Sequence, residues 1–145
     1  MSSLKLDKFV YLGNKDLRFV TEIENGINIQ CDQYYITSTL DNLIGNAIKY
    51  SNGGIVLIKL KRLSSEIKFS ISDEGVGIPR EELISIFDPF TVGSRTRTQS
   101  GEIPNGQVGL GLALCKLVIK AHNGTISAES TEEKGAIFKF TLPLT

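Results

Sequence analysis

The chain has 145 residues, of which 41% are hydrophobic and 22% charged, a composition typical of one globular domain. Lysine plus arginine and aspartate plus glutamate each number 16, so the sequence predicts neither a basic nucleic-acid surface nor a polybasic membrane contact. The two cysteines, Cys31 and Cys115, lack metal-ligand spacing and are too few for a disulfide framework, which indicates a reducing compartment. Because no signal peptide or bilayer-spanning stretch is visible, we expect a cytoplasmic domain, whose parent protein is either soluble or membrane-anchored.

The first predicted elements are a strand and a long helix. Polar and apolar residues alternate over residues 17–23, and we expect residues 27–29 to continue this strand as a hairpin around Asn25-Gly26. Asp32 is placed to cap a helix that runs to about Tyr50.

The rest of the chain predicts a two-layer fold. The elements that follow are strands over 55–60 and 66–72, a short helix over 80–84, a helix over 109–122, and strands over 125–130 and 136–142. The helix over 109–122 is apolar nearly all round, so we expect it to be buried. Because helices and strands come in blocks without regular alternation, the fold class is α+β, with helices on one face of a mixed, mostly antiparallel sheet.

The long helix carries two stripes of opposite character. An apolar stripe at intervals of three and four predicts the core face and consists of Ile36, Leu40, Leu43, Ile44 and Ala47. Asn42, Asn46 and Lys49 form a second stripe nearly opposite to it. Asparagine is a poor helix former, and amide oxygens suit Mg²⁺, which takes few protein ligands, while the lysine suits a phosphate. The alternative interpretation is an ordinary solvated face.

Two glycine-containing segments complete the chemical pattern. The strand over 66–72 delivers Asp73 to its end, and the glycines of the stretch from Asp73 to Pro79 let the backbone approach a flat ring such as adenine. The stretch from Gly106 to Leu112 opens the second helix, where exposed N–H groups and the helix dipole favour phosphate. A flexible loop ahead of a core helix is the alternative for this second segment.

Four segments in order resemble the motif boxes of one family. Residues 42–51 resemble the N box of sensor histidine kinases, residues 73–78 their G1 box, residues 87–90 their F box, and residues 109–112 their G2 box. The order and spacing match over nearly the whole chain, from Leu17 to Leu142. The chain therefore resembles the GHKL (Bergerat-fold) ATP-binding superfamily, and within it the catalytic ATP-binding domain of a sensor histidine kinase.

The resemblance implies a fold and a domain organisation. Residues 1–145 would form one catalytic ATP-binding domain, an α/β sandwich of three helices on a mixed sheet. The polar, glycine-rich stretch over about 91–108 would be the ATP lid, hinged at Phe87 and Phe90. The implied cofactors are ATP and Mg²⁺.

The resemblance also implies residue roles. Asp73 would accept a hydrogen bond from the adenine amino group, and Gly77 would line the base pocket. Asn46 would hold the metal with Asn42 supporting it or serving as the alternative ligand, and Lys49 would contact a phosphate; these three form the implied catalytic set. The remaining nucleotide contacts that the resemblance implies are Tyr50, Gly75, Ile78, Phe87, Phe90, Arg95, Arg97, Gly109, Leu110, Gly111 and Leu112.

The sequence departs from the family pattern at two places. Gln107-Val108 precedes Gly109 where many members have Gly-Thr, so a hydroxyl contact to phosphate is missing, and Gly135-Ala136 is a reduced final glycine motif. Position 42 bears on the reaction, since superfamily ATPases of the gyrase and chaperone kind have a glutamate there to activate water. Asn42 cannot accept a proton at neutral pH, so hydrolysis should be slow and the γ-phosphoryl group kept for another acceptor.

The acceptor of that group is expected on another domain. The single histidine, His122, lies at the end of a helix, where a histidine favours the helix C-terminus or caps it, and it does not resemble the phospho-accepting site. We expect a monomeric, excised or stand-alone domain whose partners are a histidine-containing dimerisation domain, in the same parent or in trans, and a response regulator. The alternatives are a serine protein kinase of the anti-sigma kind and a nucleotide-binding docking module without catalysis.

Overall fold

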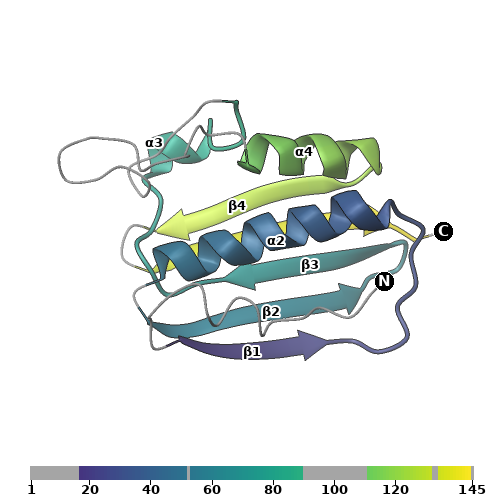
Figure 1. Cartoon of the computed structure of the whole chain (residues 1–145), viewed down its shortest axis with the longest axis horizontal. Coiled ribbons are helices and arrows are strands. Elements are labelled where there is room, and N and C mark those ends of the chain that lie inside the picture. Colours follow the sequence, from purple (N-terminus) through teal and green to yellow (C-terminus); the bar gives the residue numbers. More distant parts are fainter. Residues whose placement is uncertain (1–16, 52, 90–110, 132–133, 145) are drawn as a thin grey trace.

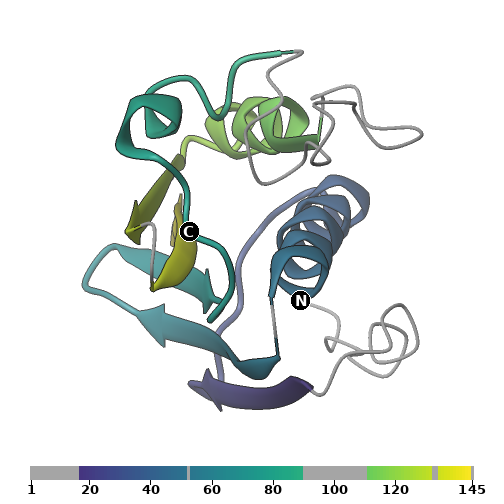
Figure 2. The same cartoon turned by 90° about the vertical axis from the view of Figure 1, so that its left-hand side faces the viewer.

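The structure is a computed structural model, and it describes residues 17–51, 53–89, 111–131 and 134–144. Figure 1 and Figure 2 show a sheet with helices packed on one of its faces. The elements in chain order are β1 (Leu17–Ile23), α2 (Gln33–Tyr50), β2 (Gly54–Arg62), β3 (Glu66–Ser72), α3 (Arg80–Leu83), α4 (Gly111–Ala121), β4 (Thr125–Thr131) and β5 (Gly135–Pro143). This arrangement confirms the predicted α+β sandwich.

The five strands form one sheet in the order β1-β2-β3-β5-β4. Strand β1 pairs with β2 in parallel, and the other three pairings are antiparallel, which confirms a mixed, mostly antiparallel sheet. The predicted hairpin around Asn25-Gly26 is wrong. The chain does turn there, with Gly26 at a φ of 77°. However, Ile27 and Ile29 then pack against the core instead of pairing with β1, whose partner comes only after α2.

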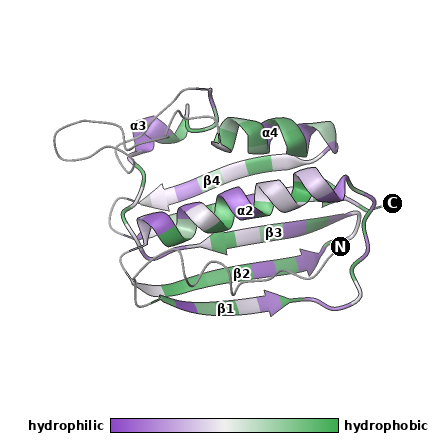
Figure 3. Ribbon diagram, in the orientation of Figure 1, coloured by the Kyte–Doolittle hydropathy of each residue, from purple (hydrophilic) through white to green (hydrophobic). Residues whose placement is uncertain are grey.

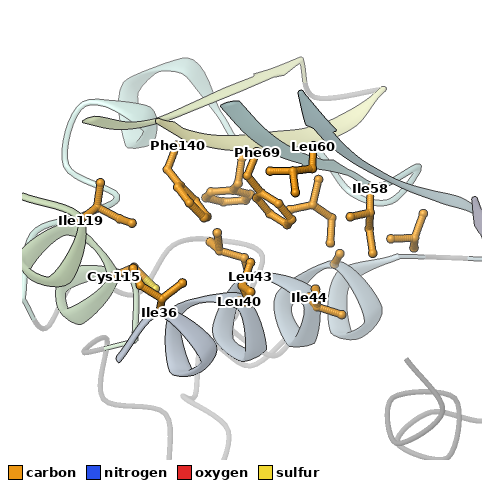
Figure 4. Packing of buried hydrophobic residues seen from close by; sticks show 14 of the residues in the cluster. Ile36, Leu40, Leu43, Ile44, Ile58, Leu60, Phe69, Cys115, Ile119 and Phe140 are labelled. Atoms are coloured by element: carbon orange, nitrogen blue, oxygen red, sulfur yellow. The ribbon is translucent and has the colours of Figure 1, made fainter. Parts of the chain in front are cut away.

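The core lies between α2 and the sheet. In Figure 4, Leu40 and Leu43 point from α2 toward the sheet, where the rings of Phe69 and Phe140 stack with centroids 4.9 Å apart. All five residues of the predicted core stripe of α2 are buried, and Leu43 and Ile44 have no exposed surface. Burying each such side chain contributes about 1.5–3 kcal/mol to stability, so the stripe fixes which face of α2 turns outward.

Helix α2 begins and ends close to where the sequence predicts. The side chain of Asp32 accepts a hydrogen bond from the backbone N–H of Tyr35 at 3.2 Å, which confirms it as the N-cap. At the other end, Ser51 donates its N–H to the carbonyl of Ala47 at 3.1 Å. Gly53 and Gly54 then take positive φ values of 99° and 84° and reverse the chain into β2.

Helix α4 departs from the prediction of an element buried all round. Figure 3 shows hydrophobic residues along much of α4, and its side chains Ala113, Cys115 and Ile119 are buried. Leu114 and Leu117, however, are 52% and 65% exposed. The helix packs against α2, β4 and β5 with one side only, so its outer side meets solvent. Among the helices of the described ranges, none has the length and apolar character needed to cross a bilayer.

Candidate functional site

Asp73 lies directly after β3 and is held by the backbone around it. The residue is only 5% exposed, although a carboxylate is costly to bury without hydrogen bonds. Its Oδ1 accepts the N–H of Gly75 at 3.0 Å and faces the N–H of Ala136 at 3.4 Å. Its own N–H donates to the carbonyl of Ala136 at 3.0 Å. The direction of this carboxylate is therefore fixed by β5 on one side and by the following loop on the other.

The loop after Asp73 lies against the C-terminal end of α2. A Cβ at Gly75 would stand 1.9 Å from the carbonyl oxygen of Tyr50, so no side chain fits at that position. The N–H of Val76 donates to the same oxygen at 3.3 Å. Glycine at position 75 thus brings the predicted base-binding loop into backbone contact with the helix that carries the predicted metal and phosphate ligands.

The polar stripe of α2 is accessible in part. Asn42 and Asn46 are half-buried, and Lys49 is exposed. The Lys49 ammonium lies 5.2 Å from the centroid of the Tyr50 ring, a cation–π distance that keeps the charge near the end of the helix. The stripe therefore offers two amide groups and one cation along a single helix face.

The start of the described part of α4 contacts the same stripe. A Cβ at Gly111 would stand 3.2 Å from Oδ1 of Asn42, so glycine permits a close approach there. Asn42 and Tyr50 are separated by about 12 Å along the axis of α2, at 1.5 Å per residue. The two glycine contacts thus place the segment after Asp73 at the C-terminal end of α2 and the start of α4 beside Asn42, about two helical turns earlier.

Some of the other predicted site residues lie in the described part of the chain, and the rest lie outside it. Gly77 is buried, and the side chain of Ile78 belongs to the core cluster. Phe87 packs edge-on against Phe138 with centroids 6.3 Å apart, and Leu112 packs partly buried against the core. The predicted lid over 91–108 lies outside the described residues, as do Phe90, Arg95, Arg97, Gly109 and Leu110.

Sequence reasoning assigned no role to several residues that shape the site. Gly135 has a φ of 78°, and a Cβ there would stand 2.0 Å from the carbonyl oxygen of Asp73. Ser130 bonds to both Ile78 and Gly135. Glu74 accepts the N–H of Ile55 at 3.1 Å. The glycine at the start of the last strand was the available signal, whereas a serine in an edge strand has no distinctive pattern.

A hollow elsewhere on the molecule is not the predicted site. It has a volume of about 430 Å³ and lies between α2 and α4. Its lining consists of Tyr34, Tyr35, Ser38, Thr39, Asn42, Leu114, Cys115, Leu117, Val118, Ala121 and His122. This lining is mostly apolar and contains no lysine, arginine, aspartate or glutamate, so it lacks the charged groups that recognise phosphates. Asn42 is its single member from the predicted set.

His122 lies at the end of α4 and bonds to backbone groups, and Cys115 belongs to the hydrophobic core. Nδ1 of His122 lies 2.7 Å from the carbonyl of Val118, and Nε2 accepts the N–H of Asp32 at 3.0 Å, so the proton belongs on Nδ1. The imidazole thereby caps α4 and links it to the N-cap of α2. Burial raises the pKa of the Cys115 thiol to about 12, which leaves it unreactive at neutral pH.

Comparison with known proteins assigns a family. The family described as histidine kinase-, DNA gyrase B- and HSP90-like ATPase matches residues 31–145. The chain is 37% identical to the sensor histidine kinase WalK of Bacillus subtilis over 97% of its own length and 23% of WalK. It is 38% identical to the adaptive-response sensory kinase SasA of a Synechococcus strain over 90% of its own length and 34% of SasA. The chain thus spans about a third or less of these relatives.

Solved structures show the same fold. The catalytic domain of the histidine kinase ThkA superposes with a TM-score of 0.77 at 27% identity, covering 95% of this chain and 86% of that domain. The structure of ThkA in complex with the response regulator TrrA gives a TM-score of 0.72 at 27% identity, covering 97% of this chain and 37% of the ThkA chain.

Proposed function

Because the chain belongs to the family of histidine kinase-, DNA gyrase B- and HSP90-like ATPases, we propose that it binds Mg-ATP and supplies the γ-phosphoryl group to a histidine on a separate dimerisation domain. The relatives WalK and SasA are a sensor histidine kinase and a sensory kinase, and both are longer than this chain. The structure of ThkA with a response regulator supports a response regulator as the second partner.

The observation that carries this proposal is the backbone contact at Gly75. It supports a shared site, because the loop that follows the buried carboxylate of Asp73 lies against the backbone of Tyr50, the residue after Lys49 of the polar stripe, with no side chain between them. An ionised carboxylate offers about four acceptor positions on two oxygens, so one oxygen can be held by the backbone while the group accepts a hydrogen bond from a ligand. We assign Asp73 to the adenine amino group.

The stripe of α2 fits a magnesium–phosphate group. Mg²⁺ takes few protein ligands and keeps waters and phosphate oxygens, so a half-buried amide such as that of Asn46 is a suitable donor, with Asn42 as support or alternative. When bound, the metal neutralises charge that develops on the phosphates. Lys49 adds a cation beside it, and Tyr50 packs against the nucleotide. Asn42 has no basic oxygen to activate water, which preserves the γ-phosphoryl group for transfer.

Replacing Asp73 with asparagine tests the proposal. Asp73→Asn keeps an oxygen that can accept the N–H of Gly75 but removes the charge offered to adenine. A hydrogen bond to a charged group contributes about 1.5–3 kcal/mol, so Mg-ATP should bind about ten- to a hundredfold more weakly. Calorimetric titration with ATP, with and without magnesium, measures this directly, and the melting temperature of the free protein checks that the fold is intact.

The matched control is Glu22→Gln, which removes an exposed carboxylate on β1 that pairs with Lys59 at 3.6 Å. This variant should bind Mg-ATP as the wild type does. If the nucleotide raises the melting temperature of the Asp73→Asn variant as much as that of wild type, the assignment of the pocket is wrong.

A further inference from the structure

The side chain of Ser130 links the two ends of the β4–β5 pair to a loop that lies 52 residues earlier in the chain. It lies on the edge strand β4, opposite Ala136 of β5. Its Oγ accepts the N–H of Ile78 at 2.7 Å and donates to the carbonyl of Gly135 at 2.6 Å. One hydroxyl therefore acts as both donor and acceptor and joins the loop after Asp73 to the start of β5.

The two segments that Ser130 joins are the ones that hold the carboxylate of Asp73. On the loop side, the N–H of Gly75 contacts Oδ1 at 3.0 Å. On the strand side, the carbonyl of Ala136 accepts the N–H of Asp73, the N–H of Ala136 faces Oδ1, and a Cβ at Gly135 would stand 3.0 Å from Oδ1. A shift of either segment relative to the other would therefore turn the carboxylate.

We propose that Ser130 is a positioning residue for the base pocket, acting through Ile78 and Gly135 on the orientation of Asp73. This inference rests on the proposed function, since it assumes that Asp73 recognises adenine. The two hydrogen bonds of the Ser130 hydroxyl described above go to the loop after Asp73 and to the start of β5. Its effect should accordingly fall on ligands that carry a base and spare ligands that consist of phosphate alone.

The side chain at position 130 must both accept and donate a hydrogen bond. Ile78 is only 2% exposed, so water cannot readily replace the lost partner of its N–H in an alanine variant. Ser130→Ala removes both bonds, whereas Ser130→Thr keeps a hydroxyl. The exposed serine of the same strand, Ser127, supplies the matched control Ser127→Ala.

The experiment compares two ligands by calorimetry, Mg-ATP and magnesium tripolyphosphate. Ser130→Ala should weaken Mg-ATP binding about tenfold, because the loss of a hydrogen bond costs about 1.4 kcal/mol of binding free energy, a factor of ten in the dissociation constant. Tripolyphosphate binding should change by less than about twofold. Ser130→Thr should recover most of the lost affinity, and Ser127→Ala should match wild type. Equal weakening of both ligands, or no weakening of Mg-ATP, would overturn the proposal.

A second measurement, by NMR, uses the wild-type protein alone, so its result does not depend on whether the variants fold. Adenosine, which has a base and no phosphate, should shift the amide resonance of Ile78, whereas tripolyphosphate should leave it in place. An unshifted Ile78 amide in saturating adenosine would contradict the proposal. If wild type binds Mg-ATP and Asp73→Asn weakens it while Ser130→Ala does not, this inference alone fails; if wild type does not bind, the proposed function fails.

Discussion

At the scale of single residues, the candidate site depends on positions where a side chain is excluded. Gly75 is the clearest case, because the space that a Cβ would need is filled by the carbonyl of Tyr50. From the sequence, we expected the glycines after Asp73 to let the backbone approach a ligand. The structure shows that at Gly75 the backbone approaches α2. In either case a glycine is needed because a neighbouring group occupies the place of a Cβ. A sequence pattern does not reveal which group that is.

Substituting alanine at two glycines should separate steric exclusion from helix propensity. Gly75→Ala should lower the free energy of unfolding by about 3 kcal/mol or more, because its Cβ would overlap a backbone oxygen. A Cβ at Gly45, in the middle of α2, would meet no described atom within 4 Å, so Gly45→Ala should stabilise the fold by about 0.5–1 kcal/mol. Urea unfolding measures both changes, and an unchanged midpoint for Gly75→Ala would refute the steric argument.

At the scale of elements, α2 organises the molecule. Its apolar stripe faces the sheet, Asn42 of its polar stripe lies beside the start of α4, and its C-terminal backbone contacts the loop after Asp73. Its bounds and both stripes could be predicted because they follow from helical periodicity and capping, which are local. The hairpin prediction failed because strand pairing depends on distant residues. The apolar composition of α4 did not reveal that only one of its sides is covered.

The contact between α2 and α4 should make stability depend on alkaline pH through Cys115. Its Sγ lies 3.9 Å from the carbonyl of Thr39, and burial raises its pKa from 9.0 to about 12. The unfolded thiol ionises first, so the neutral thiol stabilises the fold fully below pH 9, and this contribution is lost between pH 9 and about 12.

Between pH 8 and pH 10, wild type should therefore lose about 1.3 kcal/mol more of its free energy of unfolding than Cys115→Ala does. Urea unfolding of both proteins at the two pH values provides the comparison. The stability that Cys115→Ala loses through poorer packing is the same at both pH values, so it cancels from the comparison. Parallel losses in the two proteins would show that the thiol does not ionise on unfolding.

At the scale of the whole molecule, the surroundings of His122 support the prediction that this chain does not phosphorylate its own histidine. Both ring nitrogens of His122 are engaged with backbone groups, of Val118 and Asp32, and the ring ends α4 instead of standing on an exposed helix face. The contacts of Gly75 with Tyr50 and of Gly111 with Asn42 could be anticipated only through the family resemblance, because the residues between these segments carry no signal of tertiary contact.

Incubation with γ-labelled ATP should leave this chain unlabelled and label a supplied histidine-containing dimerisation domain from a relative such as WalK. The expected phosphoryl group is acid-labile, as phosphohistidine is. The variant Asp73→Asn serves as the control with weakened ATP binding and should transfer less label. An acid-stable label would favour a serine kinase, and nucleotide binding without any transfer would favour a docking module.

The place of β5 in the sheet has a consequence for synthesis. This strand follows all the other described elements in the chain, yet it lies inside the sheet between β3 and β4. While a nascent chain still holds residues 135–143 within the ribosome, β3 and β4 have no common neighbour, and the backbone of Asp73 lacks the strand to which it bonds. The domain therefore completes its fold only after β5 has been translated. Until then the N-terminal elements expose apolar surface, to which chaperones bind.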